Sequence, residues 1–167
     1  MNKFIKAQAT IYEQVLSELR SGKKKTHWIW YIFPQTAGLG HSTTAKYYAI
    51  TNLEEAQEYL DHPILGARLI ECSEIMLNLE NKSALNVLGS TDSMKLKSCM
   101  TLFAKTYHSN PVFEKILIKY FQGEWDIKTL ELLKLVNSHA PLLSPLEIKN
   151  LRESAKKASL MAIGKFK

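Results

Sequence analysis

Apolar residues recur every three or four positions along most of this chain, which is the spacing of an amphipathic helix. Near the start of the sequence, the residues that follow this spacing are Phe4, Ala7, Ile11, Val15 and Leu19. They predict a helix over residues 2–20, which Gly22 would end as its C-terminal cap. The same spacing returns in later segments, so we expect helices to dominate the fold.

Prolines, glycines and capping residues divide the rest of the chain into further short helices. Pro34 ends an aromatic run at residues 27–33, which we interpret as a short buried helix with Thr26 as its N-cap. A strand is the alternative, but the sequence offers no second strand to pair with it. Capping boxes at residues 51–54 and 144–147 begin two more helices. The other predicted helices cover residues 41–50, 63–79, 83–88, 92–107, 110–122 and 126–136.

This pattern predicts an all-α protein, a single compact domain of about eight or nine short helices. We expect residues 1–136 to form its core and residues 137–167 to form a basic helical extension packed on the same domain. No apolar run reaches the roughly 18 residues that a membrane span needs. The first residues also lack the apolar core of a secretory signal. A cytoplasmic protein that does not enter a membrane is therefore expected.

Positive charge gathers at the two ends of the chain and bears on the choice of partner. The net charge is +6. Residues 1–26 hold six Lys/Arg and two acids, residues 149–167 hold six and one, and the residues between them hold ten and thirteen. Basic ends suit an acidic protein partner, nucleic acid or anionic lipid, and they also suit a solvated surface that keeps the protein soluble.

The cysteines and histidines predict no metal site and no cofactor. Cys72 and Cys99 both fall inside helical patterns, where buried, reduced thiols are the expected state. The five histidines are scattered, and neither a Cys-x-x-Cys pair nor a His-x-x-x-His pair occurs. Candidate chemistry therefore has to come from other side chains.

The least ordinary stretch is residues 26–42, where an aromatic run stops at a proline and continues through two glycines. Trp28 and Trp30 are two positions apart and diverge by about 200° on a helix, so only one can face a cleft. Gln35 follows the proline, where its amide can point into a cleft or cap a neighbouring helix. His27 is the best single candidate for acid–base chemistry near neutral pH, although it also suits an exposed helix start.

The glycines of this stretch predict an anion cradle. Gly38 and Gly40 precede Ser42 at a predicted helix start, where backbone N–H groups and hydroxyls can donate to an anion. The segment lacks the third glycine of a dinucleotide fingerprint and the lysine of a P-loop. A plain tight turn is the alternative interpretation.

Polar side chains three positions apart on helices complete the candidate set. Asp92, Lys95 and Ser98 share one face of a predicted helix, and a cation beside hydroxyls suits phosphate or carboxylate. An N-cap aspartate beside a solvated lysine is the alternative, and Arg68 with Glu71 also fits an ordinary helical ion pair. The predicted ligand-binding residues are Trp28, Trp30, Gln35, Gly38, Gly40, Ser42, Arg68, Lys95, Ser98 and Thr101. The catalytic candidates are His27, Glu71 and Asp92.

Four ordered blocks resemble one known family. They are Thr-His-Trp-x-Trp-x-Ile-Phe-Pro-Gln with Gly-Leu-Gly-x-Ser (26–42), His-Pro-x-Leu-Gly-x-Arg-Leu-x-Glu-Cys (62–72), Asp-x-x-Lys-Leu-x-Ser-x-Met-Thr-Leu-Phe (92–103) and Gly-x-x-Asp-x-x-Thr-Leu (123–130). The chain up to about Leu133 resembles the domain of unknown function 1810 family. The resemblance implies an all-α fold found in small bacterial proteins and implies no established activity. The residues beyond this match look like an addition to the family core.

Three functions fit these residues. The first is a pocket for a small-molecule anion, nucleotide-like or ADP-ribose-like, built around residues 27–42; both a catalytic and a purely binding role fit it. The second is a protein-interaction module without catalysis, which uses the basic ends to hold an acidic partner. Nucleic-acid binding through those ends ranks last, because the sequence shows no recognition-helix motif.

Overall fold

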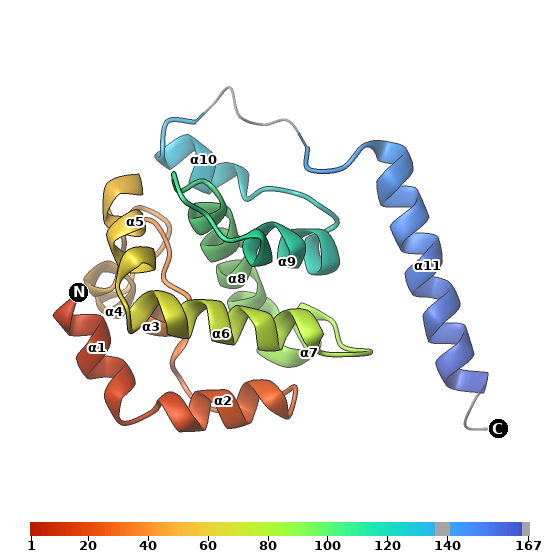
Figure 1. Ribbon diagram of the computed structural model, residues 1–167, viewed down its shortest axis with the longest axis horizontal. Coiled ribbons are helices and arrows are strands. Elements are labelled where there is room, and N and C mark those ends of the chain that lie inside the picture. The colour runs from red at the N-terminus through yellow and green to blue at the C-terminus, as the bar shows by residue number, and fades with distance from the viewer. Residues whose placement is uncertain (136–140, 165–167) are drawn as a thin grey trace.

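The computed structural model describes residues 1–135 and 141–164, and these residues form eleven helices and no sheet (Figure 1). The predicted all-α fold is confirmed, with slightly more helices than expected. They are α1 (Asn2–Ala9), α2 (Tyr12–Arg20), α3 (Ile29–Ile32), α4 (Thr43–Tyr47), α5 (Leu53–Asp61), α6 (Leu65–Asn78), α7 (Ala84–Leu88), α8 (Ser90–Ala104), α9 (Pro111–Phe121), α10 (Ile127–Leu132) and α11 (Pro145–Gly164). Among the described residues, no helix has the length and apolarity to cross a membrane.

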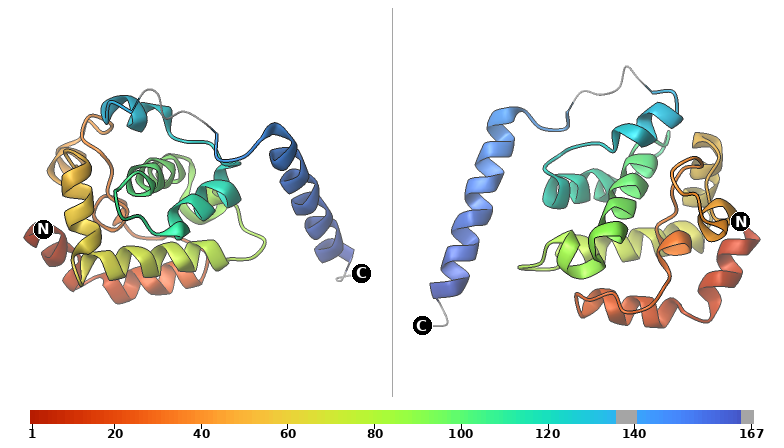
Figure 2. Two further views of the ribbon diagram at one scale, coloured as in Figure 1. Left: turned by 45° about the horizontal axis from the view of Figure 1, so that its top comes forward. Right: turned by 180° about the vertical axis from the view of Figure 1, so that it is seen from behind.

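Helix α8 lies at the centre of the fold. The left view of Figure 2 looks nearly along it and shows the other helices around it. It contacts α5, α7, α9 and α10, and its buried side chains point in every direction around the helix axis. Leu96, Cys99, Met100 and Phe103 are fully buried in the core. A helix that is covered on all sides in this way is typical of the interior of a domain.

The predicted first helix is two helices. It breaks at Thr10 and Ile11, so that α1 packs on α3 while α2 packs on α6. Gln8 fixes the bend, because its side-chain amide donates to the backbone oxygen of Tyr31 at 2.7 Å and to the hydroxyl of Tyr59 at 3.1 Å. A single straight helix could not reach both neighbours, so the tertiary contacts override the continuous apolar spacing.

Helix caps confirm several predicted boundaries. Asp126 accepts from the backbone N–H of Thr129, and the side chain of Asn110 caps the helix that begins at Pro111. The Ser-Pro-Leu-Glu capping box at residues 144–147 is present in full, with both of its hydrogen bonds. These motifs work locally, which is why the sequence identifies them well.

Other predicted boundaries are wrong by one to a few residues. The helix at 27–33 shortens to α3, with Trp28 in place of Thr26 at its N-cap. The box at 51–54 shifts by one position, because Asn52 caps α5 by accepting from the backbone N–H of Glu55. Helix α8 begins two residues before Asp92, directly after Gly89.

Helix α11 lies beyond the residues that resemble the known family. Leu143, just before it, lies against Gly123, and Arg152 donates to the side-chain oxygen of Gln122. Leu146 and Leu151 in its first turns are 66% and 43% exposed. That residues 137–167 pack on the same domain stays a prediction, and residues 136–140 and 165–167 lie outside the described part.

Candidate functional site

The site is built on a loop that closes on itself between α3 and α5. Residues 36 and 50 form an isolated parallel bridge, in which the backbone N–H of Ala37 donates to the oxygen of Ile50 and that of Ile50 donates to the oxygen of Gln35, both at 2.8 Å. The hydroxyl of Thr36 donates to the same Ile50 oxygen at 3.2 Å. The bridge pins both ends of the loop that carries α4, and it explains why the helix predicted for 41–50 stops at Tyr47.

The two glycines of the loop are required by close packing. A Cβ atom on Gly40 would lie 2.4 Å from the Cβ of Ala45 in α4. Gly38 has a φ of +100°, and a Cβ there would lie 2.9 Å from a methyl carbon of Leu132. The loop can therefore fold back against α4 and α10 only with glycine at these two positions.

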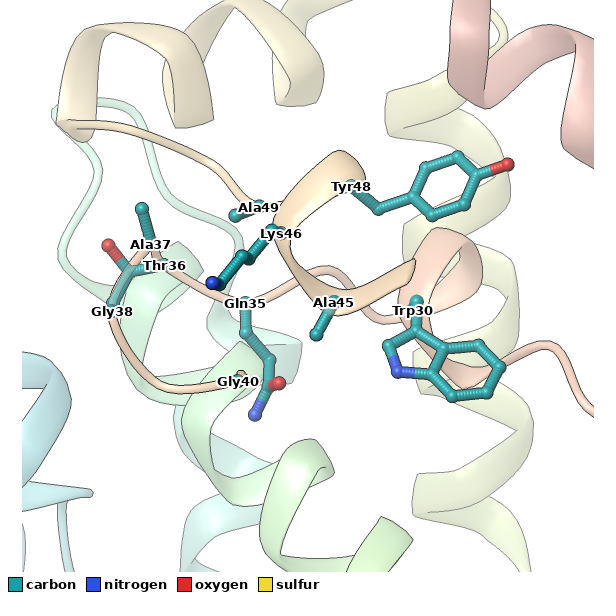
Figure 3. A pocket seen from close by; sticks show the side chains of 10 residues that line it. All are labelled: Trp30, Gln35, Thr36, Ala37, Gly38, Gly40, Ala45, Lys46, Tyr48 and Ala49. Carbon is teal, nitrogen blue, oxygen red and sulfur yellow. The ribbon is translucent and has the colours of Figure 1, made fainter. Parts of the chain in front are cut away.

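A small cavity lies between this loop and α4. Its volume is about 130 Å³. The residues that line it are Trp30, Gln35, Thr36, Ala37, Gly38, Gly40, Ala45, Lys46, Tyr48 and Ala49 (Figure 3). Sites that enclose whole drug-sized ligands measure roughly 300–1,000 Å³, so this cavity has room for a small ion or one group of a larger molecule.

Three hydrogen-bond donors at the cavity are free of protein partners. Among the described residues, the indole N–H of Trp30, the side-chain amide of Gln35 and the ammonium of Lys46 make no side-chain hydrogen bond and no ion pair. In Figure 3 the indole nitrogen of Trp30 faces the space between α4 and Gln35, and the ammonium of Lys46 lies beside the loop. No carboxylate lines the cavity. The cavity therefore presents donors without an acid to neutralise them.

The segments around the cavity are entirely basic in their charged residues. Residues 1–12 and 19–53 contain seven Lys/Arg and no Asp or Glu. They supply α1, α3, α4 and the loop, so the chain segments that line the cavity contain lysine and arginine but no acid, although the middle of the chain is mildly acidic. Positive charge close to a cavity attracts anions.

Lys95 contacts Trp30, which lines the cavity, and Asp92 pairs with Lys95. The ammonium of Lys95 is 4.9 Å from the centre of a Trp30 ring, within the range of a cation–π contact. Asp92 pairs with Lys24 at 2.8 Å and with Lys95 at 3.5 Å. Asp92 is thus held by two cations, while Lys95 combines its longer ion pair with a place on the Trp30 ring.

Glu18 is the residue that positions the aromatic segment, and the sequence prediction missed it. It is 2% exposed and accepts hydrogen bonds from the backbone N–H groups of Lys25 and Thr26, from the Thr26 hydroxyl, from the Trp28 indole and from Gln14. Burial alone would raise the pKa of the Glu18 carboxyl, but these hydrogen bonds outweigh it and lower the pKa to about 2. A glutamate three residues after Val15 lies on the apolar face of its helix, and that was the available signal.

Trp28 and His27 do not line the cavity. Trp28 is fully buried, with its indole N–H 3.2 Å from Glu18, so it is the tryptophan that packs in the core. His27 is exposed, and its backbone oxygen accepts from the hydroxyl of Tyr31 at 3.3 Å. Of the two tryptophans, Trp30 is the one that faces a cleft, in line with the expected divergence along a helix.

Arg68 and Glu71 lie in a separate cluster where α1, α2 and α6 meet. Arg68 covers the ring of Tyr12 at 4.6 Å and donates to Gln8, while Glu71 accepts from the Tyr12 hydroxyl at 2.8 Å. Burial raises the pKa of the neighbouring Cys72 thiol to about 12, which keeps it protonated. These groups join helices, and none of them lines the cavity.

Ser98 and Thr101 fix the start of α10. The Ser98 hydroxyl donates to the carboxylate of Asp126 at 2.9 Å, and the Thr101 hydroxyl accepts from the backbone N–H of Asp126 at the same distance. Both side chains are buried. The hydroxyl oxygen of Ser42 likewise accepts from the backbone N–H of Ala45, so Ser42 is the N-cap of α4. The structure therefore brings together Trp30, Gln35, Gly38 and Gly40 from the predicted set, with Lys95 beside them, and adds Lys46.

Comparison with known proteins identifies the family. A family model described as "Protein of unknown function (DUF1810)" matches residues 1–133. The chain belongs to the DUF1810 family. A DUF1810-like fold is also seen in the crystal structure of the conserved hypothetical protein Rv1873 from Mycobacterium tuberculosis, which is 44% identical, with a TM-score of 0.78 over 80% of this chain and 95% of that one. No curated protein matches the chain.

Proposed function

We propose that the cavity of this DUF1810 protein binds a small anion, or the anionic group of a small molecule. The observation that carries the proposal is that three side chains lining one cavity, those of Trp30, Gln35 and Lys46, carry donors without a protein partner among the described residues, while no carboxylate lines the cavity. Donors of this kind satisfy a phosphate or carboxylate, and a charged donor makes the stronger hydrogen bonds. The basic segments around the cavity add a favourable field.

The size of the cavity limits how much of a ligand it can enclose. A volume of about 130 Å³ is too small to enclose a whole nucleotide or ADP-ribose. A ligand of either class would place a phosphate among the three donors and leave its remaining groups at the surface. The same groups would also donate to a simple carboxylate, so the anionic group is the part of the ligand that the cavity specifies.

Binding is better supported than catalysis. Acid–base chemistry needs a titratable group within hydrogen-bond reach of the ligand. Of the catalytic candidates, His27 is exposed outside the cavity, Glu71 bonds to Tyr12, and Asp92 is paired with two lysines. No Asp, Glu or His lines the cavity, and the side chain of Lys46 is assigned to holding the anion, which favours a binding protein.

Titration calorimetry of the intact protein with inorganic phosphate, AMP, acetate and adenosine tests the proposal. AMP and phosphate should bind, and adenosine, which lacks the anionic group, should not. Lys46→Gln should weaken phosphate binding roughly 10- to 100-fold, since a hydrogen bond to a charged group is worth about 1.5–3 kcal/mol. Lys115→Gln, which removes an exposed lysine from α9, is the matched control. Equal binding of AMP and adenosine, or equal effects of the two substitutions, would contradict the proposal.

A second candidate is an acidic protein partner at α11. Leu146 and Leu151 are exposed apolar side chains on a helix that lies in the strongly basic C-terminal segment, outside the family match. Such a helix suits a partner that offers an apolar strip with acidic flanks. Removing the residues after 135 should abolish capture of that partner and leave phosphate binding unchanged.

A further inference from the structure

Three tyrosine rings lie together beside α1. One comes from α3, one from α4 and one from the residue that caps α4. The ring of Tyr48 lies 4.8 Å from that of Tyr47 and 5.3 Å from that of Tyr31. Tyr31 comes from α3 and Tyr47 from α4, and Tyr48 caps α4. Tyr47 is 57% exposed, so its ring is accessible to a partner. We call this group, together with Lys3, the tyrosine surface.

The tyrosine surface shares Tyr48 with the lining of the cavity, but Lys3, Tyr31 and Tyr47 do not line it. Figure 3 shows the side chain of Tyr48 extending to one side of α4 and that of Lys46 to the other. Lys3 belongs to α1, and its ammonium lies 5.3 Å from the centre of the Tyr47 ring while donating to the Tyr47 backbone oxygen at 2.7 Å. An anion in the cavity would therefore leave the exposed face of Tyr47 free.

The positive charges around these rings indicate the chemical class of the partner. Residues 1–12 and 19–53, which supply all four residues of the tyrosine surface, contain no acid. A partner must therefore combine negative charge with flat groups that cover aromatic rings. An acidic peptide supplies flat groups only where it also carries aromatic side chains, whereas every nucleotide of an unpaired nucleic-acid strand supplies both, because its base stacks on aromatic side chains and its phosphate binds lysine.

We propose that the tyrosine surface binds an unpaired strand of RNA or DNA, with a base stacked on Tyr47 and a phosphate held by Lys3. This differs from the mode that the sequence ranked last, which used the basic ends of the chain. A paired duplex buries the base faces that Tyr47 would contact, and helix α4 is too short to read a groove. Stacking is tolerant of sequence, so a preference for single strands is expected before any preference for bases.

Fluorescence anisotropy of the full chain with a labelled oligothymidine of about 12 nucleotides tests this proposal. An abasic strand of equal length carries the same phosphates without the rings, and a duplex of the same length is the third probe. Tyr47→Ala should weaken binding of the oligothymidine roughly five- to one-hundred-fold. Tyr107→Ala is the matched control, since Tyr107 is 67% exposed but lies beside Glu54, at 3.4 Å.

The outcomes separate stacking from charge. The proposal requires that the oligothymidine bind more tightly than the abasic strand and the duplex, and that Lys3→Gln reduce the steepness of its salt dependence. It is overturned if no strand binds in low salt, if the abasic strand binds equally well, or if the two tyrosine variants behave alike. Because Tyr47 is exposed, the melting temperature of Tyr47→Ala should stay at the wild-type value. Binding of phosphate at the cavity should be unaffected, so this test and that of the anion site can fail independently.

Discussion

Replacing Glu18 by glutamine should destabilise the protein more than any other single change of charge to amide in α2. The carboxylate is 2% exposed and accepts five hydrogen bonds, which lower its pKa to about 2 from an ordinary value of 4.5. One pKa unit corresponds to about 1.4 kcal/mol, so the ionised form contributes on the order of 3 kcal/mol to the free energy of unfolding. The amide of glutamine would also place N–H groups against other donors, which adds to the loss.

The sign of the pH dependence follows from the direction of the shift. A carboxyl whose pKa is lowered by folding stabilises the protein above its unfolded pKa, and this contribution fades as the pH falls from about 4.5 towards 2. The difference in stability between the wild type and Glu18→Gln should therefore be large at neutral pH and shrink in acid. Urea denaturation followed by tryptophan fluorescence at several pH values measures it, and at neutral pH the melting temperature should fall by roughly 6–12 °C.

Glu13→Gln is the matched control for this prediction. Glu13 is exposed on the same helix, so its replacement should change stability by no more than about 0.5 kcal/mol. Equal effects of the two substitutions at neutral pH, or a difference that stays constant down to about pH 2, would refute the role given to Glu18.

Three further predictions concern the loop, the start of α10 and the C-terminal segment. Gly40→Ala should abolish phosphate binding in calorimetry, because the new methyl group would collide with Ala45 and displace α4. Ser98→Ala should lower the free energy of unfolding in urea by about 0.5–1.5 kcal/mol, since it removes one hydrogen bond to the Asp126 carboxylate while those from the backbone N–H and hydroxyl of Thr129 remain. A chain that ends at Leu135 should keep a cooperative thermal transition by circular dichroism; loss of that transition would show that the later residues are part of the core.

The sequence predicts the helices well because their signals are local. Caps such as Asp126 act within a few residues, and the helix start that it predicts is confirmed, whereas the predicted end at residue 136 is wrong, because α10 ends at Leu132. The break between α1 and α2 depends on Gln8, which bonds to Tyr31 and Tyr59 far along the chain. Nothing in the local pattern of residues 2–20 reveals that contact.

In the candidate site, too, the sequence reveals the residues with local signals and misses those that distant contacts bring together. Trp30, Gln35 and the two glycines stand out in the sequence because an aromatic run, a proline and glycines occur together. Lys46 does not stand out, because it is one lysine among many, and only the bridge between residues 36 and 50 brings it back to the loop. Ser98 shows the opposite case, since its spacing from Lys95 fitted an anion site while its hydroxyl bonds to a helix cap.

The indole N–H signals of the three tryptophans give the most direct test of the anion cavity. In an isotope-labelled sample, each indole yields its own cross-peak in a proton–nitrogen correlation spectrum, and substitutions assign them. On titration with inorganic phosphate, the signal of Trp30 should shift in a saturable way, while that of Trp28, whose indole is bonded to Glu18, should stay in place. If Trp30 does not move, or if all three signals move together without saturation, the cavity does not bind the anion.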